Sequence, residues 1–186
     1  MSEPAPRPVD VRVGSSTDGL TAVSVAERRL SAGTHEWVSL GAVAGAAVLA
    51  DQLTKRIVSG TLELGESRHV LGPLDLHHVQ NSGIAFGLFP DATTIVIVVT
   101  SLVVAWLLVV FARSGARHPV MPVGLGLVIG GSVSNLADRI RLGHVTDFID
   151  LDFWPAFNLA DTFIVVGVAL LLGAAVISDR PRPRSR

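Results

Sequence analysis

Two aspartates in the last third of the chain are placed where a carboxylate is costly to keep. Asp147 lies in the segment VTDFI and Asp161 in NLADTFIVV, and neither has an adjacent basic residue. A charged group that borders an apolar segment usually has a partner or a chemical role. Fourteen residues separate the two, with Trp154-Pro155 between them, so the chain has enough length to fold back and bring the carboxyl groups together.

Two carboxyl groups held close together share one proton, because neighbouring like charges do not both ionise easily. The ionised member can take a proton from a water molecule that attacks a carbonyl carbon. The protonated member can hydrogen-bond to the carbonyl oxygen as negative charge develops there. The pair therefore predicts aspartic-protease chemistry. Asp161 also has a simpler interpretation, because it opens an apolar run and could serve only as a helix-capping residue.

The rest of the chain offers few competing catalytic sites. It contains no cysteine, neither HExxH nor GxSxG, and its six histidines are dispersed apart from His77-His78. Disulfides, thiolate metal sites and cysteine nucleophiles are thereby excluded. A metal site built from His144 and Asp147 is an alternative that rests on two residues. We expect no metal and no cofactor, and the scattered arginines predict no nucleic-acid partner.

The elements that must position these aspartates are membrane helices. Hydrophobic residues make up 49% of the 186-residue chain and charged residues 17%, and the mean hydropathy is +0.52. The longest uncharged run has 21 residues, enough to cross about 30 Å of hydrocarbon as a helix. The first span is the weakest, because Asp51 and Lys55 interrupt it. We expect four spans, at about 37–58, 92–112, 120–138 and 160–178.

The arginines set the expected orientation, because cytoplasmic loops are enriched in basic residues. Both termini are predicted to be cytoplasmic, and segments 59–91 and 139–157 extracytoplasmic. The first 35 residues lack the apolar core of a signal peptide and predict a flexible cytoplasmic tail ahead of a membrane domain at 36–178. A basic tail at 179–186 would follow. The cytoplasmic arginines are Arg28, Arg29, Arg113, Arg117, Arg180, Arg182, Arg184 and Arg186.

The extracytoplasmic segments differ in their patterns. HVLGPLDLHHV predicts two strands joined by a turn at Gly72-Pro73. In NSGIAFGLF, the glycines predict a close backbone approach to another chain, or else the segment is a helix-entry loop with Phe86 and Phe89 at the interface. Segment 139–157 is expected to be a loop in which Asp150 and Asp152 are solvated and the aromatic residues lie at headgroup level.

Several charged and small residues have structural interpretations. Asp51 and Lys55 are spaced to pair on one helix face. Asp138 and Arg139 lie at the outer end of the third span, where the arginine can reach the interface or pair with a carboxylate. Small residues in that span predict close helix packing; they are Gly124, Gly126, Gly130 and Gly131.

Four motifs together resemble the signature blocks of the lipoprotein signal peptidase (signal peptidase II) family, in the family's order. They are DQLTK at 51–55, NSGIAFG at 81–87, GGSVSNLADRIRLGHVTDFI at 130–149 and FNLADTFI at 157–164. The resemblance implies an intramembrane aspartic endopeptidase of the bacterial inner membrane. Its substrates would be diacylglyceryl-modified prolipoproteins, cut on the N-terminal side of the lipidated cysteine. Membrane lipids and globomycin-type inhibitors are the other implied partners.

By the same resemblance, Asp147 and Asp161 are the catalytic dyad near the extracytoplasmic face. The implied fold class is an all-α polytopic membrane protein with four transmembrane helices, a small extracytoplasmic β-sheet and a short interfacial helix. Ser134, where the family often has glycine, and Ile84, where a smaller residue is common, are departures with small expected effects on packing. Substrate-binding or dyad-supporting roles are implied for Asp51, Lys55, Asn81, Gly83, Asn135, Arg139 and Asn158.

Two other function classes remain open at this stage. A small transporter or proton-coupled channel would use intramembrane Asp and Arg as a relay, and it predicts carboxylates near mid-bilayer on several spans. A non-catalytic scaffold that binds signal helices predicts that Asp147→Asn and Asp161→Asn leave function intact.

Overall fold

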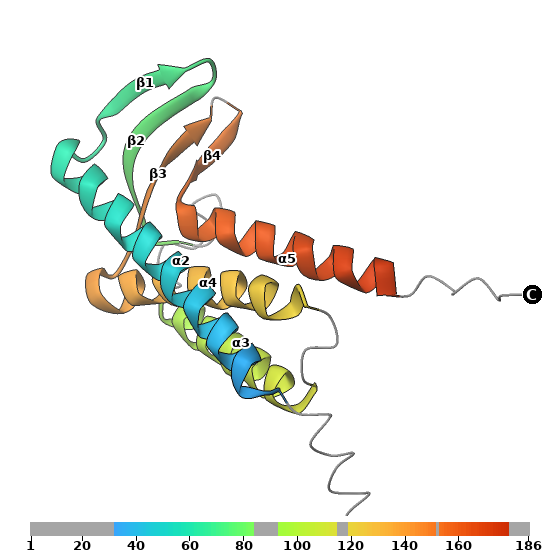
Figure 1. Ribbon diagram of the computed structural model, residues 1–186. Helices are drawn as coiled ribbons and strands as arrows, with labels where there is room; N and C mark the ends of the chain where they lie inside the picture. Colours follow the sequence, from blue (N-terminus) through green and yellow to red (C-terminus); the bar gives the residue numbers. More distant parts are fainter. Residues whose placement is uncertain (1–31, 84–92, 115–118, 152, 179–186) are drawn as a thin grey trace, which may run out of the picture.

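The computed structural model describes residues 32–83, 93–114, 119–151 and 153–178. This part of the chain forms four helices and four strands (Figure 1). The helices are α2 (Thr34–Thr61), α3 (Thr93–Ser114), α4 (Met121–Leu142) and α5 (Leu159–Ser178). The strands are β1 (Ser67–Leu71), β2 (Leu74–Asn81), β3 (Val145–Leu151) and β4 (Trp154–Phe157).

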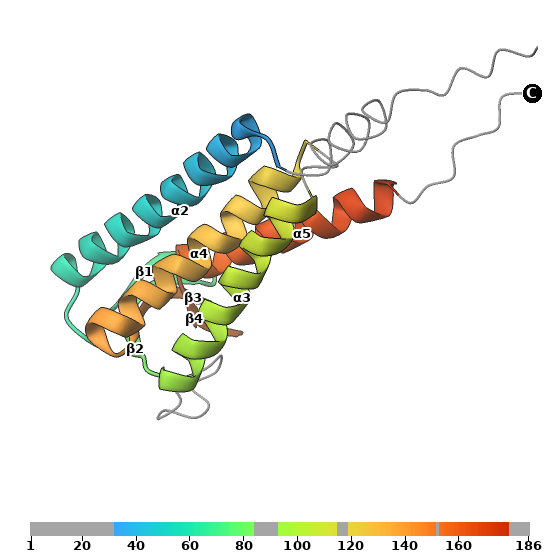
Figure 2. The same ribbon diagram turned by 90° about the horizontal axis from the view of Figure 1, so that it is seen from below.

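Helix α4 is the centre of the bundle. It packs against α2, α3 and α5, and Figure 2 shows it running between α2 and α3. Its glycines allow the close approach: a Cβ at Gly130 would lie 2.6 Å from the carbonyl oxygen of Ala44 in α2, and one at Gly131 would overlap the carbonyl oxygen of Ala160 in α5. The predicted close packing of the small residues in this helix is therefore confirmed.

Three of the helices are long and apolar enough to cross a membrane: Thr34–Thr61, Thr93–Arg113 and Leu159–Ile177. Their outward side chains are exposed and apolar, as the surface of a helix in lipid must be; on α3, Leu102 is 65% and Trp106 61% exposed. In contrast, α4 contains buried Ser134, Asn135 and Asp138, because it lies inside the bundle. Three of the four expected spans thus have a matching helix of sufficient hydropathy, and the span expected at 120–138 stays a prediction.

The sheet lies at one end of the helices and is antiparallel throughout, in the order β1-β2-β3-β4 (Figure 1). The predicted turn between two strands is confirmed, because Gly72 joins β1 to β2 with a φ of +57°. β4 leads almost directly into α5. The sheet therefore connects the end of α2, at Thr61, to the start of α5, at Leu159, and brings these distant segments to one end of the bundle.

The prediction of a loop at 139–157 is wrong. Helix α4 continues to Leu142 and ends at Gly143, whose φ of +79° suits glycine. The chain then forms β3 and β4. Residues of β3 pair with β2, so that Asp147 lies opposite Val79 and Asp150 opposite Asp75. A sheet of this size means that "all-α" does not describe the fold, which is a helical membrane bundle with a four-stranded sheet.

Some expectations fall outside the described residues. They concern the tails and their arginines, Arg117, Asp152, and the part of NSGIAFGLF that includes Ile84, Phe86, Gly87 and Phe89. The described residues contain no short helix besides α2–α5, so the interfacial helix stays a prediction.

Candidate active site

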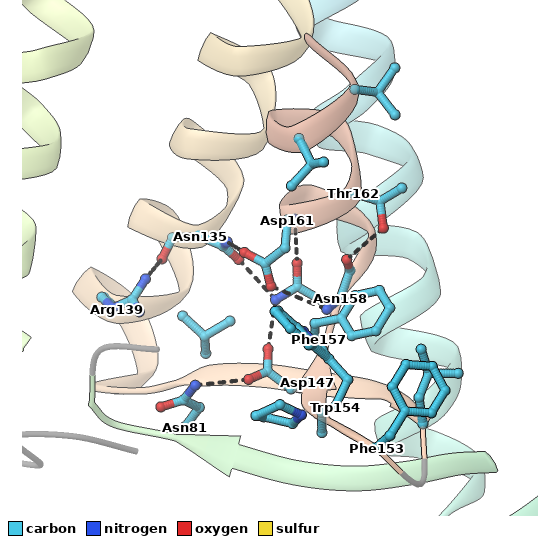
Figure 3. A pocket seen from close by; sticks show the side chains of 16 residues that line it. Asn81, Asn135, Arg139, Asp147, Phe153, Trp154, Phe157, Asn158, Asp161 and Thr162 are labelled. Carbon is cyan, nitrogen blue, oxygen red and sulfur yellow. Dashed lines mark hydrogen bonds between the residues drawn. The ribbon is translucent and has the colours of Figure 1, made fainter. Parts of the chain in front are cut away.

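Asp147 and Asp161 reach the same cavity from different elements. Asp147 lies in the middle of β3 and Asp161 in the first turn of α5. The cavity has a volume of about 560 Å³, a size typical of small-ligand and substrate sites. Figure 3 shows the two carboxyl groups facing one another across Asn158. The other polar residues that line this cavity include Asn81, Asn135 and Arg139.

Asn158 holds both carboxyl groups. Its side-chain N–H donates to Asp147 Oδ1 over 2.7 Å, and its backbone N–H donates to Asp161 Oδ2 over 3.2 Å. In return, the backbone N–H of Asp161 donates to Asn158 Oδ1 over 3.0 Å. This reciprocal pair caps the start of α5. The interpretation of Asp161 as a capping residue is therefore correct, and it coexists with a place at the cavity.

Each aspartate has a second amide donor. Asn135 Nδ2 donates to Asp161 Oδ1 over 2.8 Å, and Asn81 Nδ2 donates to Asp147 Oδ2 over 2.9 Å. Asn81 is held in turn by the backbone N–H of Gly83, which donates to its Oδ1 over 3.0 Å. Three asparagines from β2, α4 and the start of α5 thus fix the orientation of both carboxyl groups.

Asp147 is almost inaccessible, at 3% exposure. Burial raises the pKa of Asp147 to about 6, because an ion loses its hydration there. The hydrogen bonds from Asn81 and Asn158 and the charge of Lys55 lower this pKa, whereas the charge of Asp161 raises it. A carboxyl group with such a pKa exchanges its proton near neutral pH, as a general acid or base must.

Arg139 lies at the edge of the cavity without an ion-pair partner among the described residues. Its guanidinium donates to the carbonyl oxygens of Gly83, over 3.3 Å, and Asn135, over 3.5 Å. Its buried Nε has no hydrogen-bond partner in this part of the chain. Of the two alternatives for Arg139, reaching the interface or pairing with a carboxylate, the second is not found among the described residues, and its charge remains available to the cavity.

The predicted pair of Asp51 and Lys55 is confirmed, with 2.7 Å between Lys55 Nζ and Asp51 Oδ2. Lys55 also pairs with Asp138 Oδ2 at 2.8 Å and donates to Asn135 Oδ1 over 2.8 Å. Asp138 is thus a partner of Lys55 and not of Arg139. These groups do not line the cavity; they lie behind Asn135 and reach Asp161 through it.

Asp51 has a second contact that bears on the dyad. Its Oδ1 accepts a hydrogen bond of 2.9 Å from the backbone N–H of Ala160. Ala160 precedes Asp161 in the first turn of α5, where unpaired amides favour an anion. Asp51 therefore anchors the turn that carries Asp161. In this way a residue of α2 that does not line the cavity still supports the position of the dyad.

Sequence reasoning missed two polar residues near the site. Thr162 lines the cavity and donates to the carbonyl oxygen of Asn158 over 3.2 Å. Gln52 donates to Asp138 Oδ1 over 2.7 Å and to Ser134 Oγ over 3.0 Å. A usable signal existed for Gln52, since it lies inside the DQLTK motif, three residues before Lys55 on the same helix.

Two further expectations about this region change. Asp150 contacts a protein partner besides solvent, because its Oδ2 lies 2.7 Å from His77 Nδ1 on the neighbouring strand. The alternative of a metal site at His144 and Asp147 lacks a third ligand: within the described residues, no group of three His, Cys, Asp or Glu side chains is placed to hold a metal ion.

The remaining wall of the cavity is apolar. It is formed by the β3–β4 hairpin and the outer face of α5. Phe153 and Trp154 stand at the tip of the hairpin, 75% and 54% exposed, which suits residues at a membrane–water interface. The other apolar lining residues are Val145, Leu151, Pro155, Ala156, Phe157, Val165 and Val166.

Comparisons with known proteins indicate the family of this chain. Residues 43–177 match the family model described as Signal peptidase (SPase) II. A lipoprotein signal peptidase from Pelotomaculum thermopropionicum is 46% identical over 133 residues, which cover 71% of this chain and 87% of the relative. A second from Caulobacter vibrioides is 39% identical over 158 residues, covering 81% and 93%.

Solved structures give the same result. A structure described as a bacterial membrane enzyme, at 2.3 Å resolution, superimposes with a TM-score of 0.73 and 27% sequence identity, covering 84% of this chain and 97% of that one. Another of the same description, at 1.9 Å, has a TM-score of 0.69 and 29% identity, covering 81% and 97%. The cavity, the two aspartates and these matches lead to one conclusion: the chain belongs to the signal peptidase II family of membrane aspartic peptidases.

Proposed function

We propose that this membrane peptidase removes the signal peptide from diacylglyceryl-modified bacterial prolipoproteins, cleaving on the N-terminal side of the lipidated cysteine. Asp147 and Asp161 are the catalytic residues. The observation that carries this assignment is that Asn158 hydrogen-bonds to both carboxyl groups at one cavity. The printed names of the relatives supply the substrate class.

In the proposed reaction the two carboxyl groups hold one proton between them. The ionised group takes a proton from a water molecule, whose oxygen attacks the carbonyl carbon of the scissile bond. The protonated group hydrogen-bonds to the carbonyl oxygen and stabilises the negative charge that develops there. Collapse of the tetrahedral intermediate transfers a proton to the departing amine of the cysteine, so the peptide bond breaks and the dyad returns to its starting state.

The neighbouring groups have distinct proposed roles. Asn81, Asn135 and Asn158 hold the carboxyl oxygens in the orientation needed for attack, which lowers the entropic part of the barrier. Arg139 supplies positive charge beside two acids, and its hydrogen bond to the carbonyl oxygen of Gly83 holds it at the cavity. Lys55 and Asp51 act from behind, through Asn135 and Ala160.

The position of the dyad suits a substrate anchored in lipid. Asp147 belongs to β3 and Asp161 to the first turn of α5. Figure 1 shows the sheet at the end of the bundle where α5 begins, and we propose that this end is at the extracytoplasmic surface of the bacterial cytoplasmic membrane. The chain would then cross the membrane four times within a domain at 36–178, with cytoplasmic tails at 1–35 and 179–186. The apolar wall beside Val165 and Val166 would hold the substrate or a globomycin-type inhibitor next to membrane lipids.

The test is a gel-shift cleavage assay with purified protein and a diacylglyceryl-modified prolipoprotein. Wild-type protein is expected to release the signal peptide, and folded Asp147→Asn and Asp161→Asn variants to release none above background. Asp150→Asn is a matched control, because Asp150 lies on the same strand as Asp147 but pairs with His77 outside the cavity. Normal cleavage by either dyad variant would instead favour the scaffold interpretation.

A further inference from the structure

Ser134 lies in a position where its hydroxyl group has a complete set of partners. It is fully buried in α4. Its Oγ donates to Asp51 Oδ2 over 2.7 Å and accepts a hydrogen bond of 3.0 Å from Gln52 Nε2. Serine has one donor and can accept at the same oxygen, so the three residues form a directed chain from amide to hydroxyl to carboxylate. The expectation of a small effect on packing at this position understates what the side chain contacts.

The charges around Ser134 explain why a hydroxyl group matters here. One cation, Lys55, faces two buried carboxylates, Asp51 and Asp138. The remaining negative charge must be offset by neutral donors, because a buried carboxylate without enough donors is strongly unfavourable. For Asp51 those donors are the Ser134 hydroxyl and the backbone N–H of Ala160. For Asp138 the donor is Gln52.

This division of donors determines where Lys55 points. The ammonium group of Lys55 lies within ion-pair distance of Asp51 Oδ2 and Asp138 Oδ2, and it donates a hydrogen bond of 2.8 Å to Asn135 Oδ1. Asn135 Oδ1 accepts this bond from Lys55 together with one of 3.2 Å from Asn158 Nδ2, and the two donors orient the amide so that its Nδ2 faces Asp161 Oδ1 at 2.8 Å. The reversed amide would turn its oxygen toward the carboxylate of Asp161 and its N–H groups toward Lys55, and both contacts would be repulsive.

We infer that Ser134 is a positioning residue for the proposed dyad. Its hydroxyl group donates a hydrogen bond to Asp51, so that Lys55 is free to orient Asn135 and Asp51 can hold the backbone of Ala160, next to Asp161. Without this hydroxyl group, Asp51 draws Lys55 away from Asn135 to replace the lost donor. A glycine at 134 has no hydroxyl group and would supply no such bridge. The inference rests on the proposed function and deepens it.

The test compares Ser134→Ala and Ser134→Gly, which remove the hydroxyl group, with Ser134→Thr, which keeps it. Both removals are expected to lower kcat roughly 10-fold with KM unchanged, since a shift of about 1 Å in a reacting group costs about 100-fold and this displacement is smaller. Ser134→Thr is expected to restore most of the rate. Ser101→Ala is the matched control, because the hydroxyl of Ser101 in α3 donates only to its own helix, at Ile97 O.

A second readout does not depend on cleavage. Infrared titration of the buried carboxyl groups, with Asp147→Asn to identify the band, measures where Asp147 loses its proton. In the wild type that midpoint is expected at about pH 6, and the charge of Lys55 lowers it. Ser134→Ala is expected to move the midpoint to higher pH, because Lys55 moves away from Asn135 and the dyad.

Three results would overturn the inference. They are a folded Ser134→Ala with unchanged kcat and an unchanged titration midpoint, a loss of activity that only follows a loss of folded protein, and a rise in KM alone. A wild-type protein that leaves the prolipoprotein uncut would count against the proposed function instead, and the infrared titration would still decide the role of Ser134.

Discussion

The side-chain amide of Asn158 donates to Asp147 over 2.7 Å, across the junction between the sheet and α5. The same residue caps α5 and holds Asp161. A single fully buried asparagine therefore sets the relative position of two carboxyl groups that belong to different elements. Its removal should affect both at once.

Replacement of Asn158 by leucine is expected to lower kcat roughly 100-fold with a much smaller change in KM. The reason is that the dyad loses its shared donor and its geometry, and misplacement by about 1 Å costs about this much. Single-turnover cleavage with saturating enzyme measures the effect. Gln80→Ala is the control, because Gln80 is an exposed residue of β2. An Asn158→Leu enzyme of normal rate would show that Asn135 and Asn81 suffice to position the dyad.

Activity is expected to fall as the pH rises above about 6. The pKa of Asp147 is raised to about 6 by burial, so above that pH the dyad loses the proton that it shares. A pH profile of kcat/KM in detergent checks this, since its limbs report the ionisations of the free enzyme. An unperturbed carboxyl group is already ionised between about pH 5.5 and pH 8. A profile that stays flat over that range would therefore contradict the assignment.

Stability should follow the same ionisation. The pKa of Asp147 is raised from 3.8 to about 6 in the folded protein, so the folded state binds this proton more tightly than the unfolded chain does. The stability that this proton contributes is fully present below pH 3.8, the ordinary pKa, and is lost as the pH rises through the folded-state pKa of about 6. We expect Asp147→Asn to remove this decline. Thermal unfolding of both proteins across that pH range is the measurement, and parallel curves would show that Asp147 is not responsible.

Lys55→Met is expected to lower the free energy of unfolding by about 3–5 kcal/mol, because it leaves two buried carboxylates without their cation. The relevant contacts are those of Lys55 with Asp51 and Asp138, whose side chains are almost wholly buried. Reversible unfolding in mixed micelles measures the change. The control is Arg68→Gln, which breaks an exposed pair with Glu66 and should have little effect. Equal losses for the two variants would mean that burial of the Lys55 cluster is not the cause.

Gly131→Ala is expected to destabilise the protein by about 1–3 kcal/mol and to lower kcat, because the added methyl group overlaps Ala160 and pushes the start of α5, with Asp161, away from α4. Gly173→Ala is the matched control, since a Cβ there meets nothing within 4 Å. Melting temperature and cleavage rate of both variants are compared with wild type. A Gly131→Ala enzyme of normal rate would show that α5 can shift without moving the dyad.

Much of the helical framework could be predicted from the sequence. Charge-free runs produced α3 and α5 within two residues of their expected bounds, and glycine with proline marked the turn at Gly72. These are local signals, because hydropathy and turn preference act on neighbouring residues. The pairing of Asp51 with Lys55 is of the same kind, since both lie on one helix. The sequence also singled out Asp147 and Asp161, because their apolar neighbours make carboxylates costly.

The tertiary structure decided the rest. β3 was missed because its partner β2 lies about 70 residues earlier, at Val79 for Asp147, and no local pattern reports such a pairing. The partners of Asp138 and Asp150 came from other elements for the same reason. The sequence alone determined which carboxylates need an explanation. Only the packing of α2, α4 and α5 against the sheet determined which donors surround them, because a buried carboxylate is stabilised by groups that meet it in space and not along the chain.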